Sequence, residues 1–126
     1  MNVVDSSGWL EYFADAPNAT FFSMPIQNTD RLIIPSLCIF EVFKRIIQQR
    51  GEHEALLAIA AMKQGQVVDL TTSLAMAAAN VSVTESLPLA DSVIFATARA
   101  YQAVLWTQDT DFKGKENVRY VAKKPL

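Results

Sequence analysis

The chain has 126 residues, of which 51% are hydrophobic and 19% charged, and its formal net charge is −2. This length and composition predict one folded domain over residues 1–126 and exclude a disordered chain. The longest uninterrupted apolar run, residues 55–62, is too short to cross a membrane, and the N-terminal segment lacks the basic region of a secretory signal. We therefore expect a cytoplasmic protein without a membrane contact.

The single cysteine and the single histidine exclude several kinds of site. Cys38 lies among apolar neighbours and His53 in a charged turn, so the two are not expected to form a nucleophilic pair. A zinc site would require several nitrogen or sulfur ligands. We predict a buried Cys38 and a solvent-exposed His53.

The charge is unevenly distributed along the chain. Residues 113–126 contain five Lys or Arg and one Glu, a net +4, so residues 1–112 carry −6. An acidic body is unfavourable for binding phosphate unless a cation neutralises it. The basic end fits two interpretations, a segment that helps to hold a nucleic acid or a solvated charged end.

In chain order, short apolar runs alternate with segments of helical pattern. Strands are predicted at residues 2–5, 32–34, 67–70, 103–106 and 118–121. Helices are predicted at about residues 8–13, 35–50, 52–63, from 74 onward, and 89–101. No structure is assigned to residues 16–31, because Pro25 interrupts their apolar pattern.

In the predicted helix 35–50, the side chains Ile39, Phe40, Phe43 and Ile47 recur at a spacing typical of one buried face. Glu41 then lies near the edge of that face. A carboxylate that is partly shielded from water requires a partner, which makes Glu41 a candidate functional residue.

Short apolar strands separated by helices predict an α/β fold, with a mostly parallel sheet of about five strands covered by helices on both faces. Ligands of such sheets bind beyond the carboxyl ends of the strands. Asp5 stands at the C-terminal end of the first strand and Asp109 just past the fourth, and Glu41 and Asp91 lie near helix starts at the same edge. All four acids are therefore expected to converge.

Four clustered carboxylates repel one another, so such a cluster implies bound cations. Mg²⁺ prefers oxygen ligands, and Mn²⁺ has a similar preference. Such ions activate water for in-line attack on a phosphodiester and stabilise the developing charge. Taken singly, Asp5 fits a helix cap, Asp91 a first-turn residue and Asp109 a turn former, so the joint pattern carries the prediction.

The segments around these acids resemble the PIN-domain nucleases, and among them the VapC-like toxins of bacterial and archaeal toxin–antitoxin pairs. The similarity covers nearly the whole chain and is carried by residues 3–7 (VVDSS), 35–42 (PSLCIFEV), 89–98 (LADSVIFATA) and 107–112 (TQDTDF). The last segment closely matches the family's Thr/Ser-x-Asp-x-Asp-Phe ending and is the most specific of the four.

The resemblance implies a three-layer α/β sandwich with four metal-ligating catalytic residues: Asp5, Glu41, Asp91 and Asp109. It implies that the hydroxyls of Ser6 and Thr107 orient ligands or water. Asp111 fits two roles, an acid outside the ligand set or a turn residue above a buried Phe112.

The resemblance also implies a Mg²⁺- or Mn²⁺-dependent endoribonuclease that forms a homodimer. A cognate antitoxin would neutralise it by placing its C-terminal segment in the acidic cleft. Family members usually have small residues where this chain has Ser92 and Phe95. Phe95 indicates altered helix packing rather than lost chemistry.

Two other functions are considered. A phospho-accepting regulatory domain also binds Mg²⁺ at the strand ends of a small α/β fold. It needs an acidic pair after the first strand and a late lysine, whereas this chain has Asp5 alone and Thr107-Gln108-Asp109. A non-catalytic binding module of the same fold is disfavoured because all four acids are present.

Overall fold

The structure, a computed structural model, describes all residues, 1–126, and its elements follow the predicted alternation of strands and helices. The strands are β1 Asn2–Val4, β2 Leu32–Pro35, β3 Gln66–Val68, β4 Val104–Thr107 and β5 Val118–Tyr120. The α-helices are α1 Ser6–Phe13, α2 Ala19–Gln27, α3 Ser36–Arg50, α4 Glu52–Met62, α5 Thr72–Glu85 and α6 Leu89–Ala100. Two 3₁₀ turns, η1 Thr29–Arg31 and η2 Thr110–Phe112, complete the chain.

The five strands form one sheet in the order β3-β2-β1-β4-β5, and every neighbouring pair is parallel. β1 lies in the centre, where Val3 pairs with Ile33 of β2 and Leu105 of β4. These three side chains are buried, as expected for a strand covered on both faces. The predicted parallel α/β sheet is confirmed.

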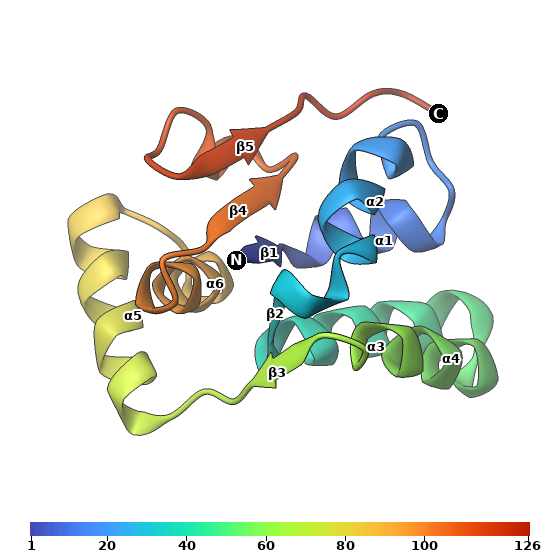
Figure 1. Cartoon of the computed structure of the whole chain (residues 1–126), viewed down its shortest axis with the longest axis horizontal. Helices are drawn as coiled ribbons and strands as arrows, with labels where there is room; N and C mark the ends of the chain where they lie inside the picture. The colour runs from blue at the N-terminus through green and yellow to red at the C-terminus, as the bar shows by residue number, and fades with distance from the viewer.

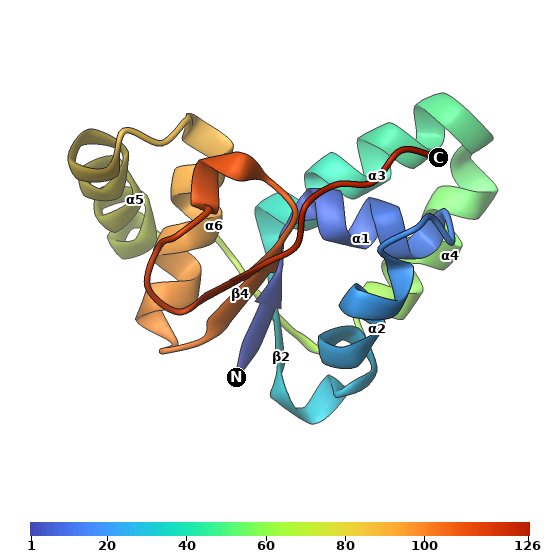
Figure 2. The ribbon, with the colours of Figure 1, turned by 90° about the horizontal axis from the view of Figure 1, so that it is seen from above.

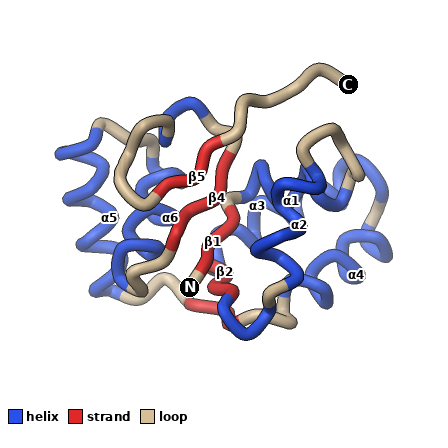
Figure 3. Tube along the Cα trace, turned by 45° about the horizontal axis from the view of Figure 1, so that its top comes forward, coloured by secondary structure: helices blue, strands red, loops and turns tan.

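Helices cover both faces of this sheet and give three layers. Helices α1 to α4 lie on one side and α5 and α6 on the other, with the strands between them (Figures 1 and 3). All five strands point the same way, so their carboxyl ends meet at one edge of the sheet. This edge is where α1 and α3 begin.

Residues 16–31, to which the sequence assigned no structure, form α2 and the turn η1. Pro25 lies inside α2 and is buried. A proline has no backbone N–H to donate, so Pro25 removes one helical hydrogen bond from α2, which ends two residues later.

The predicted buried face of α3 was wrong in part. Phe40 is 60% exposed, and the residues that α3 buries are Cys38, Val42 and Ile46. The reason is that α3 contacts both α1 and α4, so apolar side chains lie on more than one side of the helix. Lys44 covers the exposed Phe40 ring, with its Nζ 5.8 Å from the ring centroid.

Two smaller predictions are confirmed. Cys38 is buried and forms no disulfide, and His53 is exposed on α4. None of the helices combines the length and the apolar character needed to cross a membrane.

Candidate active site

The four predicted acids all lie near the carboxyl edge of the sheet. Asp5 follows β1 directly, and Asp109 comes two residues after the end of β4. Asp91 is the third residue of α6, and Glu41 is the sixth residue of α3. The parallel pairing of β1 with β4 brings Asp5 beside the end of β4.

Asp5 is held by hydrogen bonds at both carboxylate oxygens and is only 3% exposed. Its Oδ1 accepts from the Ser7 hydroxyl at 3.0 Å and the Gly8 amide at 2.9 Å, and its Oδ2 accepts from the Thr107 hydroxyl. Burial raises the pKa of Asp5 from 3.8 to about 6, even though these hydrogen bonds act in the opposite direction. Asp5 therefore caps α1 and is also a buried acid whose carboxylate is fixed in place.

Gly8 allows the close packing that surrounds Asp5. A Cβ atom at this position would lie 2.7 Å from Val4 of β1 and 2.6 Å from the Phe22 ring of α2. Only glycine lets α1 start so close to the sheet while its amide donates to Asp5.

Thr107 connects the two strand ends. Its buried hydroxyl donates to Asp5 and accepts from the Asp109 amide at 2.9 Å. Asp109 in turn accepts from the Asp111 amide at 2.9 Å and so caps η2. Phe112 ends this turn in a fully buried position.

The buried Phe112 explains the large residue at position 95. Its ring packs against Phe95 of α6, with 5.8 Å between ring centroids. Ser92 is also buried and donates to the carbonyl oxygens of Leu87 and Pro88. Phe95 thus packs α6 against η2, whereas Ser92 bonds to the carbonyl groups at the start of its own helix.

The tightest acidic group consists of Asp91, Asp109 and Asp111, whose carboxylate oxygens lie within 4.8 Å of one another. Burial, followed by repulsion from Asp109, raises the pKa of Asp91 from 3.8 to about 7. Asp111, to which the sequence gave two alternative roles, is thus part of this group. Asp5 and Glu41 lie outside it.

Glu41 accepts a hydrogen bond from a hydroxyl group near the site and is not a member of the acidic group of Asp91, Asp109 and Asp111. The Ser6 hydroxyl donates to Glu41 Oε1 at 2.6 Å, which joins the start of α1 to α3. Cys38 lies near both Asp5 and Glu41, and burial together with the charges of these acids raises the pKa of its thiol. The thiol therefore stays protonated and is not a nucleophile.

The model of the family described as PIN domain matches residues 3–117. The chain belongs to the PIN-domain family. No curated protein sequence matches it significantly.

Solved structures with the same fold are distant in sequence. A toxin–antitoxin complex from Klebsiella pneumoniae has a TM-score of 0.81 at 18% identity, over 94% of this chain and 96% of that chain. VapC20 of Mycobacterium tuberculosis, described as a sarcin-ricin loop cleaving toxin, has a TM-score of 0.77 at 19% identity, over 94% of this chain and 99% of that chain. VapBC2 from Rickettsia felis, bound to promoter DNA, has a TM-score of 0.73 at 12% identity, over 96% of this chain and 97% of that chain. At these identities the similarity establishes the fold.

This PIN domain carries a buried polar network next to the acids that the sequence did not reveal. Glu11 of α1 accepts from the Asn18 amide at 2.9 Å and from the Gln108 side chain at 3.2 Å. Asn18 donates its side-chain amide to Gln108 and to the Ala122 carbonyl, both at 3.0 Å. Because Gln108 lies between Thr107 and Asp109, the network fixes this segment against α1 and the C-terminal segment.

Replacing Glu11 by Leu is expected to lower the free energy of unfolding by about 2–4 kcal/mol, because two buried donors lose their acceptor. Thermal unfolding followed by circular dichroism measures the change. Glu11→Gln keeps one acceptor oxygen and should lose clearly less. Equal stability of the Leu variant and the unchanged protein would show that the network contributes little.

The donor set of the PIN domain fits a hard divalent cation. All candidate ligands near the sheet edge are carboxylate or hydroxyl oxygens, which Mg²⁺ and Mn²⁺ prefer. Both ion pairs in the structure involve Glu85, so no Lys or Arg neutralises the acids of the site. Burial is the main cause of the raised pKa values of Asp5 and Asp91, and repulsion from Asp109, which no cation compensates, adds to it.

Proposed function

We propose that this PIN domain, residues 1–126, is a metal-dependent endoribonuclease and the toxin of a VapBC-type toxin–antitoxin pair. The observation that carries the proposal is the acidic group of Asp91, Asp109 and Asp111 beside Asp5, with no protein cation paired to any of them. An acidic site of this kind repels phosphate unless it holds a cation, and a held cation makes it attract phosphate.

The proposed metal ligands and catalytic residues are Asp5, Glu41, Asp91 and Asp109. A Mg²⁺ or Mn²⁺ ion there would supply an activated water and stabilise the charge on the phosphate. The protein's own contribution is orientation: Thr107 and Ser7 fix the Asp5 carboxylate, and Ser6 fixes Glu41. Asp111 positions Asp109 through its amide and adds charge to the group.

The partner proposals are supported by the structures of similar fold. The Klebsiella pneumoniae structure is a toxin–antitoxin complex, and the Mycobacterium tuberculosis protein is described as a toxin that cleaves the sarcin-ricin loop. By analogy, we infer an RNA substrate and a cognate antitoxin whose C-terminal segment enters the acidic cleft. We also infer a homodimer and a cytoplasmic location for this chain.

The proposal is tested by incubating the purified protein with total cellular RNA and Mn²⁺ and mapping the new ends. We expect discrete cuts that EDTA abolishes. Because water is the nucleophile, the products should carry phosphate monoesters and no 2′,3′-cyclic phosphate. Cleavage that persists in EDTA, or cyclic phosphate ends, would contradict the mechanism.

A further inference from the structure

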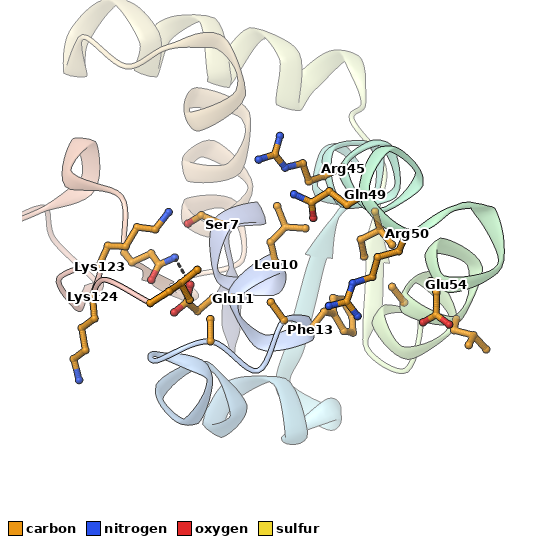
Figure 4. Close-up of a pocket in the computed structure, with 17 residues that line it drawn as sticks. Ser7, Leu10, Glu11, Phe13, Arg45, Gln49, Arg50, Glu54, Lys123 and Lys124 are labelled. Carbon is orange, nitrogen blue, oxygen red and sulfur yellow. Dashed lines mark hydrogen bonds between the residues drawn. The ribbon is translucent and has the colours of Figure 1, made fainter.

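A groove of about 550 Å³ begins beside the acidic site and runs between α1, α3, α4 and the C-terminal segment (Figure 4). At its site end it is lined by Ser7, which donates to Asp5, and by Gln108, which precedes Asp109. Its floor is partly apolar and includes Leu10, Phe13 and Ile46. A ligand in this groove could therefore reach the acids without leaving the protein surface.

The cations of the chain are not spread evenly over the surface. Five of the eleven Lys and Arg side chains are engaged by an aromatic ring or by Glu85: Lys44, Arg99, Lys113, Lys115 and Arg119. Of the six others, four line the groove: Arg45, Arg50, Lys123 and Lys124. None of these four is paired with a carboxylate. The groove thus collects most of the unpaired positive charge of a chain whose net charge is −2.

The four cations stand on two different walls. Arg45 and Arg50 belong to α3, and Arg45 lies one helical turn beyond Glu41. Lys123 and Lys124 belong to the segment after β5, which runs to the side of the sheet where α1 to α4 lie (Figure 2), and they lie across the groove from the two arginines (Figure 4). The hydrogen bond from Asn18 to the Ala122 carbonyl holds this second wall in place.

We propose that this groove binds the single-stranded RNA segment adjoining the cleavage site. Its two cationic walls contact phosphates, and its apolar floor contacts bases. The inference rests on the proposed nuclease function for the chemistry, but it concerns binding outside the acidic group. Single-stranded nucleic acids are commonly held by such a combination of a positive channel and apolar or aromatic side chains.

An extended polyanion fits these features better than an acidic peptide does. The groove is lined by four cations and by two acids, Glu54 and the buried, hydrogen-bonded Glu11, so its lining is net positive. A substrate that is cleaved at the acidic site has to extend past Ser7 or Gln108 into this space. The acids themselves repel phosphates, so neighbouring cations are needed to hold the strand. The unpaired state of all four cations is then explained by the phosphates that they bind.

The test is RNA binding by a variant without the four charges: Arg45→Gln, Arg50→Gln, Lys123→Gln and Lys124→Gln. The matched control is Arg31→Gln with Lys63→Gln, which removes the two exposed, unpaired cations outside the groove. Binding of a fluorescein-labelled oligoribonucleotide of about 12 nucleotides is measured by anisotropy in EDTA, so that no cleavage occurs.

We expect the quadruple variant to bind roughly 30-fold or more weakly at low salt, with a slope of log K against log salt smaller by about 3. The control should lose much less affinity. Unchanged affinity and slope in the quadruple variant, with its thermal unfolding also unchanged, would overturn the inference. The inference would also be overturned if the four substitutions weaken the binding of a 12-residue poly-glutamate peptide but leave RNA binding unchanged.

The binding assay separates this inference from the proposed function. If the protein binds RNA through the groove but does not cleave it with Mn²⁺, the nuclease proposal fails and the groove inference stands. If cleavage occurs and the quadruple variant has the same KM, the groove inference fails and the nuclease proposal stands. If the nuclease proposal and the groove inference are both correct, the KM of the quadruple variant rises while its kcat is retained, because the four cations lie outside the acidic group.

Discussion

Replacing Asp91 by Asn is expected to reduce metal-dependent RNA cleavage by roughly 100-fold or more and, at the same time, to stabilise the metal-free protein. The first effect follows because a neutral amide is a poor ligand for a hard cation, and metal stabilisation of the transition state is worth several kcal/mol. The second follows because Asp91 is partly buried beside Asp109 and Asp111, which makes its charge unfavourable without metal.

The stabilisation should be about 1–2 kcal/mol at neutral pH, after allowance for the partial exposure of Asp91 to solvent. Cleavage rate and melting temperature of the EDTA-treated protein measure the two effects. Asp30→Asn is the matched control, because Asp30 is exposed in η1 before β2, at the opposite edge of the sheet. Loss of activity together with lower stability would indicate a structural role for Asp91 instead.

The metal-free protein is expected to lose stability as the pH rises from about 5 to about 8. The folded-state pKa of Asp5 is about 6 and that of Asp91 about 7, both above the ordinary value of 3.8. Between about pH 4 and these folded-state pKa values, the folded state binds more protons than the unfolded state. The stabilisation from these protons is fully present below about pH 4 and is lost as the pH rises through about 6 and 7.

The expected loss is about 2–4 kcal/mol, or roughly 10 °C in melting temperature, with EDTA present. A bound cation favours the ionised carboxylates, so excess Mn²⁺ should reverse the trend and raise the melting temperature most at high pH. Cleavage should correspondingly fall by up to about tenfold per pH unit below about pH 6. A double variant, Asp5→Asn with Asp91→Asn, should show a flatter pH profile. An identical profile in that variant would assign the effect to other groups.

The sheet, and the placement of the four acids near its carboxyl edge, could be predicted because both depend on local pattern and one geometric rule, although only Asp91 and Asp109 of the four share the tightest acidic group. Apolar runs such as 32–34 gave the strands, and parallel strands place their carboxyl ends at one edge. Pro25 obscured α2, since proline inside a helix is unfavourable in isolation, whereas here its side chain is buried two residues before the helix ends. The buried face of α3 was misassigned because two neighbouring helices contact it.

The details of the site depend on tertiary contacts that no local pattern reveals. Asp111 joins Asp91 and Asp109 only because η2 turns its carboxylate toward α6. The hydrogen bond between Glu11 and Gln108 spans 97 positions in sequence, and that between Ser6 and Glu41 spans 35. Motif spacing indicated the candidate acids, whereas the groups that hydrogen-bond to them could be found only in the fold.

The division of the basic residues illustrates the same limit. The sequence shows a C-terminal segment with net charge +4 and leaves its role open. In the structure Lys113 and Arg119 lie over aromatic rings and Lys115 pairs with Glu85. Only Lys123 and Lys124 of this segment line the groove, where Arg45 and Arg50 of α3 join them. The positive charge that lines the groove therefore comes from two distant segments.

The most direct test of a metal site at the carboxyl edge of the sheet is the anomalous scattering from a crystal of the protein soaked in Mn²⁺. We expect a strong anomalous peak within coordination distance of the Asp91 and Asp109 carboxylates, and its absence in a crystal of the Asp109→Asn variant. A peak at other residues only, or no ordered Mn²⁺ at millimolar concentration and a pH above about 7, would contradict it.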